Sequence, residues 1–359
     1  MRKAYPRLAR RLLSQGRWGA LAQAGWTALG VKRGVRQGKP TTGPMLGTLF
    51  LTYRCNNDCY MCHTLEVAKE RKGKGLKELN EEGLKRLIDG FAELGTTALS
   101  LTGGEPLIRP EAPDLVAYAR AKGLIVHLNT NGMLVDEAMA KRLVGAGIDS
   151  VNLSLDGAKA ETHDRLRRTK GGFERVRAAV GHLKKAGCPA VNLVSVVGAE
   201  NLDEIPGIVD LARGWKADSL GLMPAQFFEL PSMRPQGDRA MTPEKTETLS
   251  RLLEGLKGDP LLESSDAYLG LFRDCLSGKE SPLSCLVGYH SLTVDCYANV
   301  YRCFPFGLMG VDPRPLENRT LPEWWASEEA AGVRRQALAC KACYWNCHTE
   351  LNLLFQGAA

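Results

Sequence analysis

The sequence predicts an α/β protein with an open barrel of six parallel strands, followed by a small cysteine-rich hairpin and helix region. Six apolar runs with strand character alternate with segments of helical spacing, polar clusters follow several of these runs, and cysteines gather at two places in the chain. Alternating strands and helices favour a parallel sheet, whose strands end at one common edge. We therefore expect the functional groups at that edge.

The elements follow one another regularly along the chain. Strands are predicted at residues 47–51, 97–101, 125–128, 151–155, 191–197 and 219–223. Helices are predicted between them at residues 80–94, 136–146 and 173–186. Residues 231–260 have the composition of a polar linker with a helix near 243–256, and residues 291–294 and 299–301 are typical of two strands of a hairpin. Because six strands are fewer than the eight of a closed barrel, we expect an open one.

Composition indicates a large enzyme-sized protein from a reducing compartment. The chain has 359 residues, 44% of them hydrophobic, which is enough for a barrel and a smaller appended region. Its 11 cysteines are clustered like metal ligands and do not have the composition of a disulfide scaffold. The sequence has no run of about 18 apolar residues and no secretory signal pattern. We therefore expect a cytoplasmic protein.

Positive charge is concentrated in a basic amphipathic arm at residues 1–45. Residues 1–40 hold ten Lys and Arg and no acidic residue. The charge of this segment therefore exceeds the net charge of the whole chain, which is +7. The apolar residues of the arm recur on one helix face: Trp18, Leu21, Ala22, Gly25, Trp26 and Leu29. We expect this face to pack on the barrel. Contact of residues 1–40 with an anionic membrane surface, which would make the protein peripherally membrane-associated, is the alternative, and no motif supports nucleic acid binding.

A first cysteine cluster follows the first predicted strand. Cys55, Cys59 and Cys62 have C-x3-C-x2-C spacing, which places three thiolates in one short loop. Three thiolates on a 4Fe–4S cube leave one iron open to a small chelating molecule. Zinc is the alternative metal for these cysteines, but only Cys59 and Cys62 have the pair spacing of a structural zinc site.

The second predicted strand ends in the run Thr-Gly-Gly-Glu-Pro at residues 102–106. Gly103 and Gly104 carry no Cβ and allow close approach of the backbone to a ligand or to other backbone groups. Glu105 adds a carboxylate at the same strand end. A turn is the ordinary function of two glycines, but here they follow a three-cysteine loop.

With both motifs intact, the chain resembles the radical S-adenosylmethionine (SAM) superfamily. The resemblance implies a partial (β/α)6 TIM-like barrel at residues 46–230, in which Cys55, Cys59 and Cys62 bind a 4Fe–4S cluster and SAM chelates the open iron. It also implies that Gly103, Gly104 and Glu105 contact the amino group of SAM. Met61 stands where the superfamily usually has an aromatic residue whose backbone meets the adenine, so we expect Met61 to keep that backbone contact.

Polar residues after the third and fourth strands are the next candidates. They are ordinary turn formers when taken singly. The resemblance implies that they bind the SAM ribose and carboxylate; they are Asn129, Asn131, Ser154 and Asp156. The segment 163–167 is similar to a superfamily element whose arginine reaches the SAM carboxylate. We assign that role to Arg167, with Arg165 and Arg168 as competitors.

A second cysteine set lies in the last 75 residues, predicted as a separate region at residues 284–359 after a helical linker at 231–283. Its candidate ligands are Cys285, Cys303, Cys340, Cys343 and Cys347. Four soft thiolates accept either a cluster or zinc. The region resembles the SPASM/twitch extension, a β-hairpin and helix unit that implies one auxiliary 4Fe–4S cluster here, because the region has six cysteines and the two-cluster form uses seven. Cys347 is the main substitute within this set, and Cys296 is spare.

The resemblance implies an oxidoreductase that cleaves SAM reductively to a 5′-deoxyadenosyl radical, which abstracts hydrogen from an unactivated C–H bond. We expect a flavodoxin or ferredoxin as electron donor, and net oxidation or bond formation aided by the auxiliary cluster. A small-molecule, sugar or lipid substrate is our main expectation, because only about 45 residues precede the first strand, too few for the recognition domain that peptide maturases often carry. Peptide maturation is the alternative. An iron–sulfur or zinc scaffold without enzyme activity would have no use for the Gly-Gly-Glu-Pro run.

Overall fold

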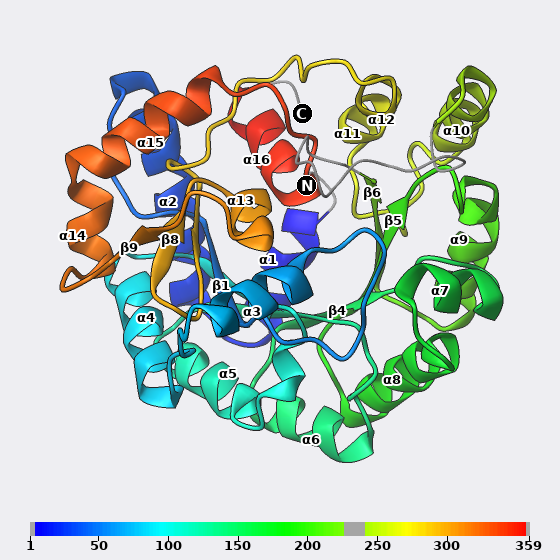
Figure 1. The fold of residues 1–359 in the computed structure, drawn as a ribbon, viewed down its shortest axis with the longest axis horizontal. Helices are drawn as coiled ribbons and strands as arrows, with labels where there is room; N and C mark the ends of the chain where they lie inside the picture. The colour runs from blue at the N-terminus through cyan, green and yellow to red at the C-terminus, as the bar shows by residue number, and fades with distance from the viewer. Residues whose placement is uncertain (1–3, 226–240, 357–359) are drawn as a thin grey trace.

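A curved sheet of nine strands organises the molecule (Figure 1). The computed structural model describes residues 4–225 and 241–356. The strand order is β6-β5-β4-β3-β2-β1-β7-β8-β9, and every pair from β6 to β7 is parallel. The predicted open, partial barrel is therefore confirmed. The first residues of the predicted linker, and its boundary with the barrel at residue 230, lie outside the described residues.

All six predicted barrel strands are present within a few residues of their expected bounds. They are β1 (Leu46–Thr52), β2 (Ala98–Gly103), β3 (Ile125–Thr130), β4 (Ser150–Ser154), β5 (Val191–Val197) and β6 (Ser219–Pro224). The helices between them are α3 (Thr64–Gly73), α4 (Glu81–Glu93), α5 (Ala112–Ala121), α6 (Glu137–Gly145), α7 (Ala160–Arg167), α8 (Gly172–Ala186) and α9 (Ile205–Gly214). Two 3-10 turns, η1 (Pro106–Ile108) and η2 (Leu202–Glu204), complete this part.

Alternation along each strand separates the two faces of the sheet. Leu99 and Leu101 of β2 are fully buried and belong to the main hydrophobic core. Ser100 and Thr102, between and beyond them, line a cavity on the concave side. Successive side chains of a strand point to opposite faces, and the convex face is covered by α4, α5, α6, α8 and α9 (Figure 1). The outer face is thus the apolar core, while the concave face is largely polar.

Side-chain caps fix two of the predicted helix starts. Asn80 accepts a hydrogen bond of 3.0 Å from the backbone N–H of Gly83, at the start of α4. Asp136 accepts one of 2.7 Å from the backbone N–H of Met139, at the start of α6. Such caps satisfy N–H groups that have no partner inside the helix, and each capping residue is the first residue of a range that apolar spacing predicted as helical.

The cysteine-rich C-terminal part continues the barrel sheet. β7 (Ser291–Val294) pairs in parallel with β1, and β8 (Asn299–Tyr301) returns antiparallel to β7 as the predicted hairpin. The remaining elements are β9 (Arg314–Pro315), α10 (Pro243–Gly255), α11 (Asp266–Gly270), α12 (Phe272–Leu276), α13 (Phe304–Met309), α14 (Leu321–Ala326), α15 (Glu328–Ala339) and α16 (Asn346–Gln356). Residues of β7, β8 and α14 share the hydrophobic core of the barrel strands, so the two parts pack as one unit.

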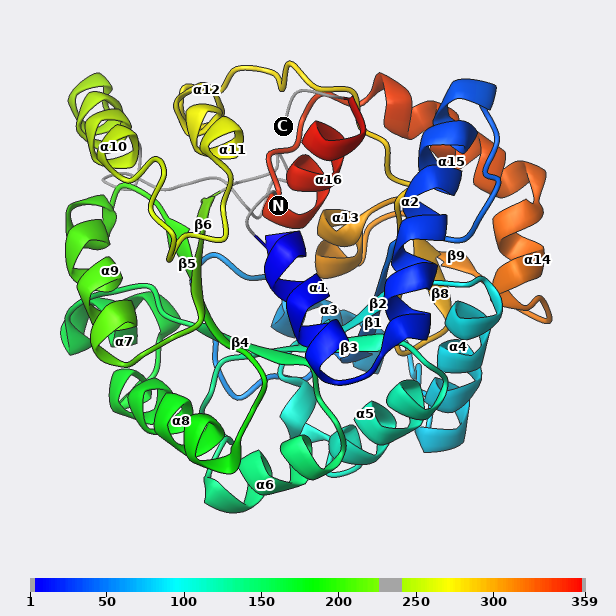
Figure 2. The same ribbon diagram turned by 180° about the vertical axis from the view of Figure 1, so that it is seen from behind.

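The N-terminal arm forms two helices, α1 (Ala4–Ser14) and α2 (Trp18–Gln37). Both views of the ribbon place α1 on the concave side of the sheet, near α16 (Figures 1 and 2). Helix α2 packs through Thr27, Gly30, Val31 and Gly34, which are buried.

The expectation that the apolar face of this arm packs on the barrel was wrong. Trp18, Trp26 and Leu29 are 66%, 69% and 68% exposed. The physical reason is the small size of the residues that face inward, because glycines allow the helix backbone to approach the loop at residues 39–42 closely. Among the described helices, none combines the length and apolar content needed to cross a bilayer.

Candidate active site

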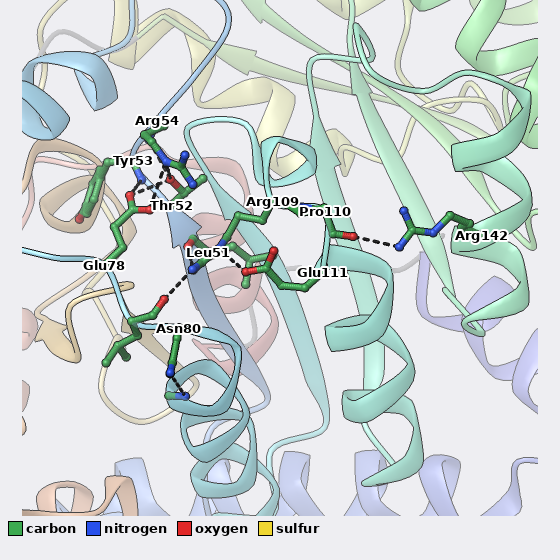
Figure 3. Close-up of polar contacts among 12 residues, drawn as sticks. Leu51, Thr52, Tyr53, Arg54, Glu78, Asn80, Arg109, Pro110, Glu111 and Arg142 are labelled. Carbon is green, nitrogen blue, oxygen red and sulfur yellow. Dashed lines mark hydrogen bonds and ion pairs between the residues drawn. The ribbon is translucent and has the colours of Figure 1, made fainter.

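The end of β1 is held in place by two side chains that the sequence analysis did not single out. Glu78 accepts hydrogen bonds from the Thr52 hydroxyl (2.7 Å) and the Tyr53 backbone N–H (3.0 Å) (Figure 3). Arg109, which is buried, donates to the carbonyl of Leu51 at 2.7 Å (Figure 3). Charge-assisted hydrogen bonds of this kind are among the stronger ones in proteins. The chain therefore leaves β1 toward the cysteine loop from a fixed position.

Three thiols lie in the loop that follows. Cys59 is buried, and Cys55 and Cys62 are partly exposed. Burial raises the pKa of Cys55 to about 12 and that of Cys59 to about 11. Neutral thiols of this kind become thiolates when a metal centre binds them. Among the residues that the structure describes, no three metal-binding side chains converge as closely as a single ion requires. The donor set, three soft sulfurs in one loop, fits an iron–sulfur cube that leaves one iron open.

The two glycines after β2 are required by the backbone of this loop. Gly103 has a φ of +130°, and a Cβ there would lie 2.1 Å from the carbonyl oxygen of Thr52. At Gly104 a Cβ would lie 2.2 Å from the carbonyl oxygen of Arg54. With glycines at these positions, the Gly104 N–H donates a hydrogen bond to the carbonyl of Thr52 (2.8 Å), and the Glu105 N–H donates one to the carbonyl of Arg54 (2.9 Å). The run thus joins the end of β2 to the start of the cysteine loop.

Glu105 is fully buried beneath the loop, with both carboxylate oxygens engaged. One accepts from the Thr130 hydroxyl (2.8 Å) and from the N–H of Leu107 (3.0 Å), and the other from the N–H of Asn131 (2.8 Å). Burial raises the pKa of Glu105 to about 7. Asn131 in turn donates to Asn56 inside the cysteine loop at 2.7 Å. Glu105 and Asn131 therefore connect the ends of β2 and β3 to that loop.

Of the three candidate arginines, Arg167 faces the cysteines. Its guanidinium pairs with the buried carboxylate of Asp156 at 2.6 Å and lies 3.9 Å from the sulfur of Cys59. Arg165 pairs with Glu200 and Arg168 with Asp58, and both arginines are exposed. The structure thus separates the competitors by orientation. The paired carboxylate and the thiols both favour the charged guanidinium of Arg167, whose pKa is raised although its burial acts against the charge.

A polar ladder crosses the concave wall of the barrel below this site. Asn129, Asn152 and Asn192 are in-register neighbours on β3, β4 and β5. Each side-chain amide donates a hydrogen bond to the next: Asn192 to Asn152 and Asn152 to Asn129, both at 2.9 Å. Asn129 donates to the hydroxyl of Ser100 at 2.8 Å. The ladder lines a cavity of about 980 Å³, as does Ser154 at the end of β4. The sequence analysis named Asn129 and Ser154 but missed Asn152 and Asn192, whose only signal is their matching position in successive strands.

The cysteines of the second set lie close to one another in the C-terminal part of the chain. Cys285, Cys303, Cys340 and Cys343 interact electrostatically with one another, and burial raises the pKa of Cys285 to about 11 and that of Cys303 to about 12. Cys347 interacts with Cys343 and lines the cavity. These relations bring together the four thiols that the sequence named as candidate ligands of the auxiliary cluster, an assignment that stays a prediction. Cys296 lies apart, fully buried near Glu78.

Aromatic side chains pack between the two cysteine sets. Phe304 follows Cys303, and its ring lies 5.0 Å from that of Trp345 and 5.4 Å from that of Phe50. Phe50 in turn lies 5.4 Å from Tyr53, at the end of β1. Phe304 and Trp345 also line the cavity. Of the cysteines in the two sets, only Cys347 lines this chamber, beside the aromatic rings of Phe304 and Trp345.

Comparisons with known proteins agree with this geometry. Residues 49–212 match the family model described as the radical SAM superfamily. The AdoMet-dependent heme synthase of Methanosarcina barkeri is 28% identical over 302 residues, 80% of this chain and 84% of the relative. The PqqA peptide cyclase of Xanthomonas campestris is 30% identical over 325 residues, 84% of this chain and 80% of the relative. The chain belongs to the radical SAM superfamily.

A solved structure shows the same fold. SuiB of Streptococcus suis, bound to S-adenosylmethionine, superposes with a TM-score of 0.63 at 14% identity, covering 88% of this chain and 74% of SuiB; SuiB has also been solved with its precursor peptide SuiA. As a member of the radical SAM superfamily, the enzyme has SAM and a 4Fe–4S cluster as cofactors. It is an enzyme that modifies C–H bonds.

Replacing Gly104 with alanine tests the contact between the glycine run and the cysteine loop. Because the new methyl group would collide with the carbonyl of Arg54, the loop must move. We expect Gly104→Ala to lose at least half of the iron bound in the wild type after anaerobic reconstitution, measured per chain. Gly181→Ala, in helix α8 with open space around it, is the control and should keep its iron. Equal iron content in both variants would contradict the assigned contact.

Proposed function

We propose that this radical SAM enzyme holds its catalytic cluster on Cys55, Cys59 and Cys62 and modifies a side chain of a peptide in the chamber on the concave side of the sheet. The observation that carries the assignment of the catalytic cluster is that the guanidinium of Arg167, paired with Asp156, lies 3.9 Å from the sulfur of Cys59. Cys347 of the second thiol set lines the cavity on the concave side of the sheet. The relative with 30% identity is a peptide cyclase, which supports a peptide substrate over the small molecule or lipid that the sequence favoured.

The protein groups around the loop have distinct roles in this proposal. Gly103 and Gly104 bring backbone close to the cofactor, and Met61 in the loop, partly exposed, offers its backbone to the adenine. Arg167 binds the SAM carboxylate while Asp156 keeps the guanidinium oriented. Glu105 carries four lone-pair sites and accepts three hydrogen bonds, so one further donor, the SAM amino group, can be accommodated.

When bound, the reduced cluster supplies the electron that cleaves SAM to methionine and a 5′-deoxyadenosyl radical. The residues of this chain align the reacting atoms and exclude water and stray hydrogen donors. The ladder through Asn129 and Asn152 supports the polar floor of the chamber, and Ser154 and Asn131 stand at the strand ends above it. Phe304 and Trp345 cover the side that faces the auxiliary thiols. A flavodoxin or ferredoxin is the proposed electron donor.

A tetrapyrrole substrate is the second candidate, because the match between this chain and the heme synthase spans 84% of the length of the heme synthase. The two candidates differ in what stimulates SAM cleavage. Reconstituted enzyme with SAM and dithionite should form 5′-deoxyadenosine at least tenfold faster with a pooled peptide library than without it. Iron coproporphyrin III should leave the rate at its uncoupled level. Stimulation by the porphyrin alone would replace the peptide proposal.

Iron content tests the assignment of the two thiol sets. We expect about eight irons per chain in the wild type after anaerobic reconstitution and about four in Cys303→Ala, because each cube holds four irons. Cys55→Ala should also retain about four irons but form no 5′-deoxyadenosine. Cys188→Ala is the control, since the Cys188 thiol donates to the carbonyl of Ala190, away from both sets. About four irons in the wild type would remove the auxiliary site.

The affinity of the enzyme for SAM tests the proposed contact between Arg167 and the SAM carboxylate. Removing a charge-assisted hydrogen bond costs about 1.5–3 kcal/mol, so Arg167→Ala should bind SAM about 10- to 150-fold more weakly in anaerobic calorimetry. Arg167→Lys, which keeps the charge without the fork of donors, should bind with intermediate affinity. Arg165→Ala is the matched control and should bind like the wild type. Equal loss in the Arg165 and Arg167 variants would contradict the assignment.

A further inference from the structure

The outward face of helix α2 carries the most exposed large hydrophobic residues in the described part of the chain. Trp18, Trp26 and Leu29 are 66%, 69% and 68% exposed, whereas Leu76, the next, is 44% exposed. Two tryptophans on one exposed face are costly to leave in water, since each indole offers a large apolar surface. This concentration is therefore a candidate interaction surface.

These three residues form one stripe along the helix. The positions 18, 26 and 29 differ by eight and three residues, which places them on the same face, about 17 Å from end to end at the rise of an α-helix. Ala22 and Gly25 lie between them on that face and are exposed. Because these intervening residues are small, both indoles stand clear of the helix surface. Trp18, Trp26 and Leu29 are called the tryptophan stripe below.

The same face becomes basic toward the end of the helix. Lys32, Arg33 and Arg36 continue the line of the stripe at helical spacing and are all exposed. Residues 1–40 contain no acidic residue to neutralise them. An apolar stripe beside exposed cations on a single helix face matches the interfacial zone of a bilayer, with indoles at the headgroup level and cations near anionic lipid.

The opposite face of α2 is already occupied, which fixes the stripe outward. Gln23 donates to the carbonyl of Gly95 at 2.7 Å, and Thr27 is fully buried beside it. Gly30 packs on Thr42, and the Thr41 hydroxyl donates to the carbonyl of Gly30 at 2.8 Å. Figure 2 shows α2 in front of the sheet. The helix cannot rotate its stripe onto the barrel without breaking these contacts.

We propose that the tryptophan stripe, with Lys32, Arg33 and Arg36, docks this enzyme on an anionic lipid bilayer. Helix α2 lies in the plane of the interface, inserts its two indoles and Leu29, and places the three cations against lipid phosphates. The surface lies outside the cysteine sites and the chamber. The proposal concerns where the enzyme works and is independent of which substrate it modifies.

Vesicle sedimentation of the full-length holoenzyme tests the proposal. Wild type should pellet with phosphatidylcholine vesicles that contain phosphatidylglycerol, bind pure phosphatidylcholine much more weakly, and lose binding in high salt. Lys32→Glu/Arg33→Glu/Arg36→Glu should lower the partition coefficient on the anionic vesicles at least about 100-fold, since each cation near the surface contributes about a factor of five. Trp18→Ser/Trp26→Ser should lower it at least tenfold.

Two controls separate docking from folding and from other occupants of the stripe. Leu76→Ser removes an exposed leucine elsewhere and should pellet like the wild type, and all variants should keep the wild-type rate of 5′-deoxyadenosine formation in solution. Wild type that stays in the supernatant, or unchanged binding of the tryptophan variant, would overturn the proposal. So would a wild-type dimer that becomes monomeric in the tryptophan variant without vesicle binding, because a second copy would then cover the stripe.

Discussion

The pairing of β1 with β2 on one side and β7 on the other is the constraint on which this structure depends. β1 is central in the sheet, and both of its neighbours run parallel to it. Its carboxyl end releases the loop with Cys55, Cys59 and Cys62. The end of β2 brings Gly103 and Gly104 against the backbone of that loop. β7 begins the hairpin that leads to Cys303. The position of β1 therefore affects the placement of both thiol sets.

Burial and polarity are divided by the curvature of the sheet. The convex face is apolar and covered by helices, and it supplies the hydrophobic core. The concave face carries Ser100 and the ladder through Asn129 and Asn192, whose amides satisfy one another inside the barrel. Buried amides without partners would be costly, so the ladder stabilises a polar interior. The polar groups that line this cavity are therefore already ordered by their neighbours.

Local signals in the sequence were sufficient for the elements and for the first thiol loop. The apolar periodicity of strands and helices and the spacing of Cys55, Cys59 and Cys62 depend only on residues close in the chain. Glu78 and Arg109 could not be found in this way, because each acts on the end of β1 from a distant segment. Arg167 could be separated from Arg165 only once the turn of α7 directed its guanidinium at Cys59.

The sequence by itself determined the strand and helix order, the superfamily motifs and the amphipathic character of α2. These are properties of spacing, which short-range geometry translates directly into structure. Only the tertiary structure decided that the hairpin joins the barrel sheet through β7, and that the apolar face with Trp18 and Trp26 points to solvent. Periodicity shows that a helix has two faces but not which one packs inward. That choice depended on how closely Gly30 and Gly34 let the backbone approach the following loop.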